Sequence, residues 1–142
     1  MSVKAILDEK GRNVLTISPQ ATVREAATTL HDHHIGAVIV VDSDDHIVGI
    51  LAERDIVSAI ARFGPDCLDK SAASIMWPNV HRCREDTSIS ELMSLMSAKR
   101  ARHVPVEMNG HLVGIISIGD VVKAHIRAIE REAEEIKAYI AG

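Results

Sequence analysis

The pattern of apolar and polar positions along this chain of 142 residues occurs twice. Each copy has a short apolar run, a segment with helical spacing of apolar residues, two apolar runs joined by a tight turn, and a second helical segment. The first copy predicts strands at 14–17, 37–41 and 47–51, with helices from residue 22 and over 53–62. The second copy predicts strands at 79–83, 103–107 and 111–117, with helices over 88–99 and from about 119. Each copy therefore has the order β-α-β-β-α.

Helix-capping residues support the duplication. Thr22 and Glu25 form a capping-box pattern at the start of one helix, and Ser88 and Glu91 repeat it 66 residues later. Two copies of a unit this long predict two half-domains that bury their apolar faces against each other, not a solenoid. A duplicated fold also duplicates its clefts, so we expect two related sites.

Composition limits the possible classes of function. Hydrophobic residues make up 46% of the chain and aromatic residues 2%, which predicts a core of aliphatic side chains. The net charge of −4, without a basic stripe, disfavours nucleic acid as a partner. Two cysteines without metal-ligand spacing predict neither a disulfide framework nor a metal site. No apolar run reaches the roughly 18 residues of a membrane span and no signal peptide is recognisable, so we expect a cytoplasmic protein without a membrane partner.

Three segments carry a resemblance to a known family. They are residues 49–57 (GILAERDIV), 102–106 (RHVPV) and 114–122 (GIISIGDVV). Together with their spacing they resemble a cystathionine-beta-synthase (CBS) domain pair, also called a Bateman module, of the stand-alone bacterial type. The resemblance implies an α/β (α+β) fold of two tandem CBS repeats with pseudo-two-fold symmetry and a long C-terminal helix. The first repeat, with the N-terminal segment, would span 1–68 and the second 69–142, together forming one module.

In this family the clefts bind adenosyl compounds, which implies AMP, ADP, ATP, NAD(H) or S-adenosylmethionine as ligand. An Asp in the first turn of a helix can accept hydrogen bonds from both ribose hydroxyls, and helix N-terminal amides favour phosphate. By resemblance, one cleft would combine Asp120, Ser117, Gly119, Arg102, His103 and Pro105 with Val14, Leu15 and Thr16 across from them. Arg102 and His103 would reach the phosphates, and Pro105 would lie near the base.

The other cleft would be built around Asp55. The resemblance places Arg54 beside it, Asn79, Val80 and His81 across, and Ala37 and Ile39 beneath the base. This copy departs from the family pattern, because Ala52 stands where a hydroxyl residue is usual. The loss of one neutral hydrogen bond costs about 0.5–1.5 kcal/mol, although Arg54 can compensate as a phosphate partner. We therefore expect two unequal sites.

Several of these residues also have simpler interpretations. Asp55 and Asp120 are common helix-capping residues, and only their duplication in matching context favours a binding role. Trp77 would cover the phosphate end of a ligand or pack within the linker. His31 and His34 share a helix face, but no further ligand follows at a useful spacing, so we predict no metal site.

The end of the chain predicts an association surface. Apolar residues follow a heptad spacing in one long helix at Val122, Ile126, Ile129, Ala133, Ile136 and Ile140. This seam predicts a homodimer; the alternative is that the helix packs back on its own domain. No nucleophile–base pair or phosphate-binding loop is present, so we predict no enzyme activity. The sequence favours an adenosyl-nucleotide sensor for signal transduction with an unidentified regulated protein. The alternative is a constitutive interaction module with vestigial clefts.

Overall fold

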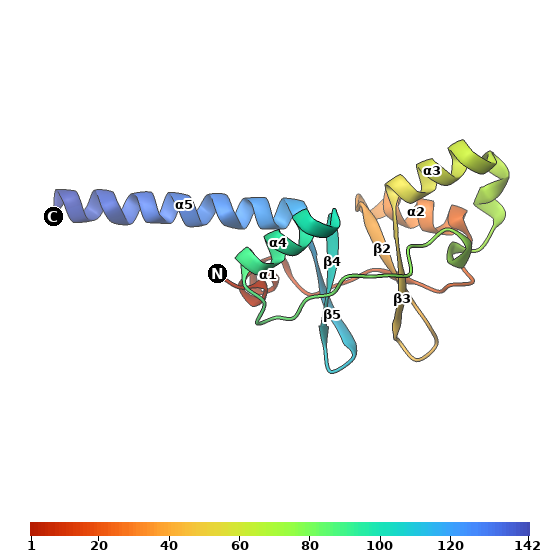
Figure 1. The fold of residues 1–142 in the computed structure, drawn as a ribbon, viewed down its shortest axis with the longest axis horizontal. Coiled ribbons are helices and arrows are strands. Elements are labelled where there is room, and N and C mark those ends of the chain that lie inside the picture. The colour runs from red at the N-terminus through yellow and green to blue at the C-terminus, as the bar shows by residue number, and fades with distance from the viewer. The chain divides into compact units, whose positions relative to one another are not determined.

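The computed structural model describes all 142 residues, which divide into two compact units. The first unit contains residues 13–81 and 108–113. The second contains residues 1–12, 82–107 and 114–142. Figure 1 shows a small sheet with helices in each of them.

The first unit is built on a three-stranded sheet in the order β1-β2-β3. Strand β1 pairs parallel to β2, with Thr16 opposite Ile39, and β2 pairs antiparallel to β3, with Ala37 opposite Ala52. The elements are β1 (Thr16–Ile17), α2 (Val23–His33), β2 (Ala37–Val41), β3 (Ile47–Ala52) and α3 (Glu53–Phe63), followed by 3₁₀ turns at Pro65–Asp69 and Ala72–Ser74.

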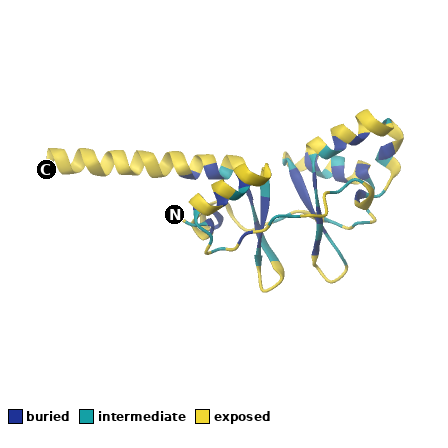
Figure 2. Ribbon diagram, viewed as in Figure 1, coloured by how far each residue is buried: buried dark blue, intermediate teal, exposed yellow.

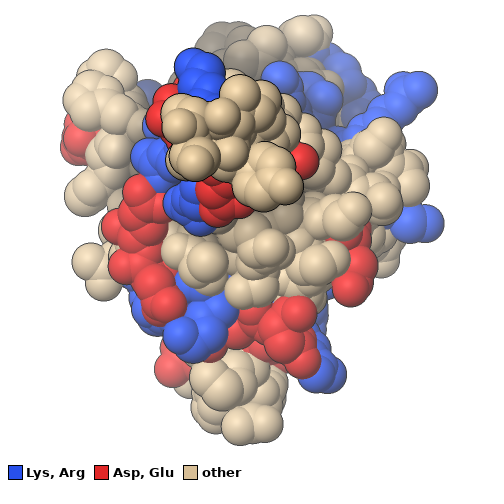
Figure 3. Space-filling model, turned by 90° about the vertical axis from the view of Figure 1, so that its left-hand side faces the viewer, with Lys and Arg blue, Asp and Glu red and all other residues tan.

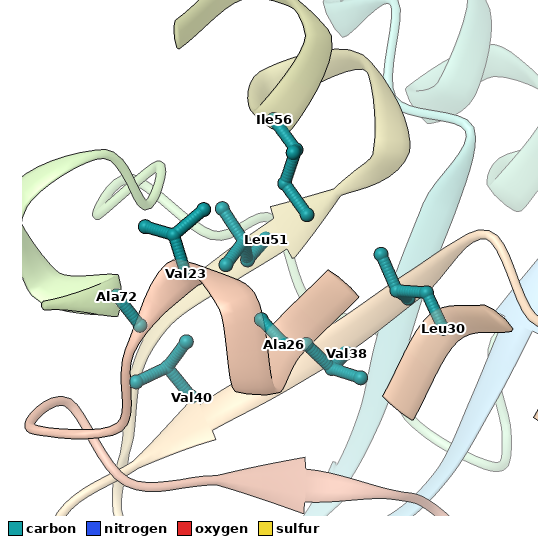
Figure 4. Packing of buried hydrophobic residues seen from close by; sticks show 8 residues of the cluster. All are labelled: Val23, Ala26, Leu30, Val38, Val40, Leu51, Ile56 and Ala72. Atoms are coloured by element: carbon teal, nitrogen blue, oxygen red, sulfur yellow. The ribbon is translucent and has the colours of Figure 1, made fainter. Parts of the chain in front are cut away.

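Aliphatic side chains fill the core of the first unit, as the composition predicts. Val38, Val40 and Leu51 from the sheet are fully buried against Val23 and Ala26 of α2 (Figure 4). This packing follows from the sequence: the apolar residues of α2 recur with helical spacing, and β2 is apolar on both faces. Since each buried aliphatic side chain contributes about 1.5–3 kcal/mol, this cluster provides much of the stability of the unit.

The second unit repeats this arrangement with a two-stranded sheet. Its elements are α1 (Val3–Lys10), α4 (Ile89–Lys99), β4 (His103–Met108), β5 (His111–Ser117) and α5 (Ile118–Ala141), except that residues 108–113 at the turn between β4 and β5 are counted with the first unit. Its fully buried side chains include Leu7, Leu92, Val104, Val106 and Ile116. Beyond Ala124, all residues of α5 are exposed, as the yellow colour of this helix in Figure 2 shows.

Helix α1 belongs to the unit of the second copy, although it precedes the first copy in the sequence. The amide of Val3 donates to Thr87 O at 2.9 Å, and the amide of Ile89 donates to Met1 O at 3.1 Å. In the first unit the segment after α3 has the same place: the amide of Val23 donates to Lys70 O at 2.9 Å. The segment that precedes each copy therefore completes the core of the other unit.

Most predicted elements are present, with small shifts at their ends. The exception is the strand predicted over 79–83, of which only Cys83 forms a bridge, to Val106 of β4. This prediction is wrong over most of its length. The predicted repeat boundaries, 1–68 and 69–142, are contiguous stretches of sequence. The compact units instead combine segments that are distant in sequence and packed together. The repeat boundaries therefore stay a prediction.

Candidate functional site

The start of α5 holds the carboxylate of Asp120 in a capping box. The hydroxyl of Ser117 accepts from the amide of Asp120 at 3.2 Å, and Asp120 Oδ2 accepts from the amide of Ser117 at 2.8 Å. Both residues of this pair are partly buried. The reciprocal bonds satisfy two amides of the first helical turn and fix the orientation of the carboxylate. Asp120 Oδ1 accepts no hydrogen bond from the protein and remains available to a ligand.

A lysine from α1 reaches the same carboxylate. Lys10 Nζ lies 2.7 Å from Asp120 Oδ2 and donates to Ile115 O of β5 at 3.0 Å. The side chain of Asp120 is 18% exposed and that of Lys10 is 34% exposed. Burial by itself would raise the pKa of Asp120, but the hydrogen bonds from Lys10 and Ser117 outweigh it and leave this pKa below its usual value. Asp120 is therefore ionised at neutral pH.

The predicted phosphate and base residues of this site lie at the beginning of β4. The amide of Ile118 donates to Arg102 O at 2.8 Å, which fixes the start of α5 against the start of β4. Arg102 is exposed, His103 is half-buried and Pro105 is buried. The structure thus brings this strand and Ser117–Asp120 together within one unit. Val14, Leu15 and Thr16 belong to the first unit, so their expected place opposite Asp120 stays a prediction.

The predicted residues around Asp55 all lie within the first unit. Asp55 Oδ2 accepts from the amide of Ala52 at 2.8 Å, but Ala52 has no side chain that can cap the helix. The amide of Glu53 donates to Gly36 O at 3.0 Å, which is the counterpart of the bond between Ile118 and Arg102. In contrast to Asp120, Asp55 forms no ion pair. The two helix starts therefore have the same backbone arrangement and different side-chain partners.

Strands β2 and β3 carry the remaining residues of this second candidate. Ala37 lies opposite Ala52 and Ile39 lies opposite Ile50. On its other side Ile50 pairs with Trp77, through hydrogen bonds of 2.9 and 3.0 Å in both directions. Asn79, Val80 and His81 follow directly after Trp77 in the chain, and the side chain of Trp77 is 55% exposed. Both interpretations of Trp77, a cover for the phosphate end of a ligand or a linker residue, stay predictions.

Sequence reasoning missed Lys10, which is the strongest partner of Asp120. The contact joins residues 110 positions apart, and periodicity within one helix carries no information about so distant a partner. The equivalence of the two copies gives one indication of where Lys10 lies. Gly49 faces Met76 and Gly114 faces Leu7, so the segment ending at Lys10 has the place that the residues after Met76 have in the first unit.

A cluster of possible metal ligands also escaped the sequence analysis. Ligand atoms of Asp42, Asp44 and His46 lie within 4.8 Å of one another in the turn between β2 and β3. The same carboxylate of Asp42 accepts from the amides of Asp44 and His46, each at 2.9 Å, and these bonds hold its pKa below the usual value. The capping of a turn accounts for the cluster. The rings of His31 and His34 lie with their centroids 6.5 Å apart, although α2 ends at His33 and His34 is left-handed.

Comparison with known proteins identifies the fold. The sequence model of the CBS domain matches residues 3–62 and 72–127, which is most of the chain and both copies. The chain belongs to the CBS domain family. Its two CBS repeats begin at α1 and at the turn Ala72–Ser74, which are the segments that complete the opposite units.

Solved structures and curated proteins agree with this assignment. A CBS-domain containing protein from Agrobacterium tumefaciens is 51% identical, with a TM-score of 0.86, over 88% of this chain and 99% of that one. The CBS domain pair of protein MJ0100, solved in complex with 5′-methylthioadenosine and S-adenosyl-L-methionine, is 28% identical, with a TM-score of 0.79, over 88% and 95%. A 17.7 kDa protein of Acidianus ambivalens is 34% identical over 129 residues, 87% of this chain and 77% of its own.

None of the helices has the length and apolar character needed to cross a membrane.

Proposed function

We propose that this CBS-pair protein is a non-enzymatic sensor that binds an adenosyl ligand through Asp120. The observation that carries the proposal is the fixed, ionised carboxylate of Asp120 in the first turn of α5, with Oδ1 free to accept a hydrogen bond. The ribose diol of an adenosyl compound offers two hydroxyl donors that suit a carboxylate. The complex of the MJ0100 pair with two adenosyl compounds supports this class of ligand.

The start of α5 suits the phosphate end of such a ligand through the amide of Gly119, since the amides of Ile118 and Asp120 already donate to Arg102 O and Ser117 Oγ. Helix N-termini carry partial positive charge and unpaired amides, which favour anions. Gly119 leaves this turn open, since a Cβ built there would meet only Ser117 Oγ, at 3.6 Å. Arg102 and His103 at the adjoining start of β4 would supply further donors. AMP, ADP, ATP and NAD(H) fit this arrangement. S-adenosylmethionine shares their adenosyl group but carries a sulfonium and an amino-acid tail in place of a phosphate.

The Asp55 site is proposed as the weaker of the two. It retains the Asp at the helix start and the strand residues Ala37 and Ile39, with Asn79, Val80 and His81 in the same unit. It lacks both the capping hydroxyl of Ser117 and an ion pair to the carboxylate. Arg54, exposed in the first turn of α3, would contact a phosphate there.

A second copy of this chain is the proposed partner of α5. This helix has 24 residues, a length of about 36 Å, and its seam is not covered by the rest of the second unit. Ile129 and Ile136 are each 54% exposed, so the part of the helix beyond Ala124 leaves its apolar residues uncovered. Acidic and basic side chains are interspersed on the face at which α5 ends (Figure 3). A paired apolar seam flanked by mixed charges is the pattern of a coiled-coil dimer.

Regulation would follow from a difference in affinity. A ligand shifts the equilibrium between two arrangements of the protein only as far as it binds one more tightly than the other. We propose that the bound and free arrangements differ in the surface they offer to a regulated protein in the cytoplasm. No catalytic step is assigned to the chain, and neither nucleic acid nor a membrane is proposed as a partner.

A thermal-shift panel tests the ligand proposal. Purified protein, freed of carried-over nucleotide, is heated with AMP, ADP, ATP, NAD, NADH and S-adenosylmethionine. A ligand at about 100 times its dissociation constant adds about 2.7 kcal/mol to stability, which raises the melting temperature by several degrees. Asp120→Asn should abolish most of the shift while it keeps an oxygen for the Ser117 amide. Asp86→Asn, which changes an exposed carboxylate paired with Arg84, is the matched control. No shift with any adenosyl compound would favour a constitutive interaction module.

A further inference from the structure

Lys10 connects the N-terminal helix α1 to the carboxylate of Asp120, which we propose as the ribose-binding group. It is the last residue of α1, and both hydrogen bonds of its ammonium go to the start of the α5 site: Asp120 Oδ2 at 2.7 Å and Ile115 O at 3.0 Å. Its side chain is about one-third exposed, so the ammonium is only partly hydrated. A cation held in this way is part of the binding surface and not a remote surface charge.

This lysine has no counterpart at Asp55. Leu7 faces Gly114 as Met76 faces Gly49, so these two positions are equivalent. Six residues separate Leu7 from Val14, but only three separate Met76 from the matching Val80. The three additional residues extend α1 by nearly one turn and end it at Lys10. In the other copy Trp77 is followed by Pro78, which cannot continue a helix. The carboxylate of Asp120 therefore has a lysine as ion-pair partner, whereas the carboxylate of Asp55 has none.

Lys10 competes with a ribose for the carboxylate. Asp120 Oδ2 already accepts from Lys10 and from the Ser117 amide, so a diol that needs both carboxylate oxygens must displace the ammonium from Oδ2. A displaced ammonium loses a charge-assisted hydrogen bond unless the ligand replaces it. The phosphate of a ligand such as AMP can take the place of the Asp120 carboxylate as the partner of Lys10. A neutral nucleoside offers no such anion. The sulfonium of S-adenosylmethionine adds a second positive charge near the ammonium, which repels it.

We infer that Lys10 makes the Asp120 site selective for phosphorylated adenosyl ligands. In the empty site it pairs with Asp120, and in the occupied site it pairs with the phosphate of the ligand. Its flexible four-carbon stem allows this exchange without movement of α1. The inference rests on the proposed function and adds to it a preference among ligands. The inference also gives a second cause for the expected difference in affinity between the two sites. The Lys10 charge contributes to this difference together with the missing hydroxyl at Ala52.

Titration calorimetry with AMP, adenosine and S-adenosylmethionine tests the inference. Asp55→Asn is introduced throughout, so that the Asp120 site accounts for the binding. In this background AMP should bind more tightly than adenosine or S-adenosylmethionine. Lys10→Met should reduce the ratio of AMP to adenosine affinity by about tenfold, the loss of one charge-assisted contact. Lys10→Gln should do the same, whereas Lys10→Arg should retain most of the preference. Lys4→Met is the matched control, because Lys4 lies on the same helix and pairs with Asp8.

The possible outcomes separate the inference from the proposed function. If Lys10→Met lowers the melting temperature but leaves the affinity ratio unchanged, Lys10 is a structural brace and the inference is wrong. If ligands bind the unaltered protein but not the Asp55→Asn protein, binding occurs at the other site and the inference fails while the sensor function stands. If no adenosyl compound binds the unaltered protein, both fail. A reduced ratio in Lys10→Met together with an unchanged ratio in Lys4→Met supports the inference.

Discussion

Leu7 fills the space that a side chain at Gly114 would need. A Cβ built on Gly114 would lie 2.7 Å from Leu7 Cδ2 and 2.9 Å from Leu7 Cδ1, closer than carbon atoms approach without repulsion. Leu7 itself is fully buried. Strand β5 and helix α1 therefore meet at a glycine, and this close contact holds Lys10 at the start of α5.

The first prediction follows from this contact. Gly114→Ala should lower the free energy of unfolding by about 1–3 kcal/mol, because an extra methyl group in a filled core displaces its neighbours. Urea denaturation measures the change. The same substitution should cost less in a Leu7→Ala background, where the obstructing methyl groups are gone, although Leu7→Ala alone should cost about 2–5 kcal/mol.

A glycine without such a neighbour provides the control. Gly119 lies in the first turn of α5, and its nearest neighbour to an added Cβ is Ser117 Oγ at 3.6 Å. Gly119→Ala should leave stability unchanged or raise it by roughly 0.5–1 kcal/mol, because alanine restricts the unfolded chain. Equal losses from Gly114→Ala and Gly119→Ala would contradict the packing of α1 described above.

The second prediction exchanges the caps of the two equivalent helices. Ala52 and Ser117 have nearly the same backbone, with φ and ψ of −106° and 162° against −96° and 164°. Ser117→Ala should cost about 0.5–2 kcal/mol of stability, and Ala52→Ser should recover a similar amount, since only the capping hydroxyl changes. Chemical denaturation of both variants provides the measurement. A destabilising Ala52→Ser would show that the environment at the start of α3 does not accept a hydroxyl.

Local sequence signals predicted the helices and turns well, because their causes lie within a few residues. The caps at Thr22 and Ser88 bond the amides of Glu25 and Glu91 at 3.0 Å, as the capping pattern indicated. The two-residue turn at Asn109 has the positive φ that an Asn-Gly hairpin requires. These elements need no information from distant parts of the chain.

Long-range packing was beyond the same reasoning. The apolar residues of α1 recur with helical spacing, but this local pattern does not indicate which unit the helix completes. The strand expected at 79–83 fails for a related reason. Apart from the bridge at Cys83, this stretch forms no ladder, and Pro78 just before it removes a backbone donor. The same limit hid Lys10, whose importance depends entirely on the position of α1.

The third prediction concerns acid stability. The folded-state pKa of Asp120 lies below its value of about 3.9 in the unfolded chain, so ionised Asp120 stabilises the fold above that pH. As the pH falls through the lower, folded-state pKa, this contribution is lost. The difference in unfolding free energy between the unaltered protein and Asp120→Asn should be constant above about pH 5 and shrink below about pH 4. A difference that grows on acidification would contradict the ion pair with Lys10.

The fourth prediction tests the seam of α5. If Ile129 lies in a paired apolar interface, Ile129→Glu places two like charges in it and leaves each of them poorly hydrated. The variant should dissociate, with a dimer dissociation constant at least about 100-fold higher, since each charge loses roughly the free energy of a desolvated polar group. Light scattering and sedimentation at micromolar concentration measure the mass.

Ala128→Glu is the matched control for the seam, because Ala128 lies next to Ile129 on α5 but outside the heptad positions. It adds the same charge to the same exposed helix and should leave the dimer intact. Since helix content should stay equal in both variants, circular dichroism separates loss of association from loss of the helix. A monomer in the unaltered protein would disprove the dimer outright. Dissociation by both variants would indicate a general effect of charge on α5. An intact dimer in both variants would place the interface on another surface, such as the exposed Val57 and Phe63 of α3.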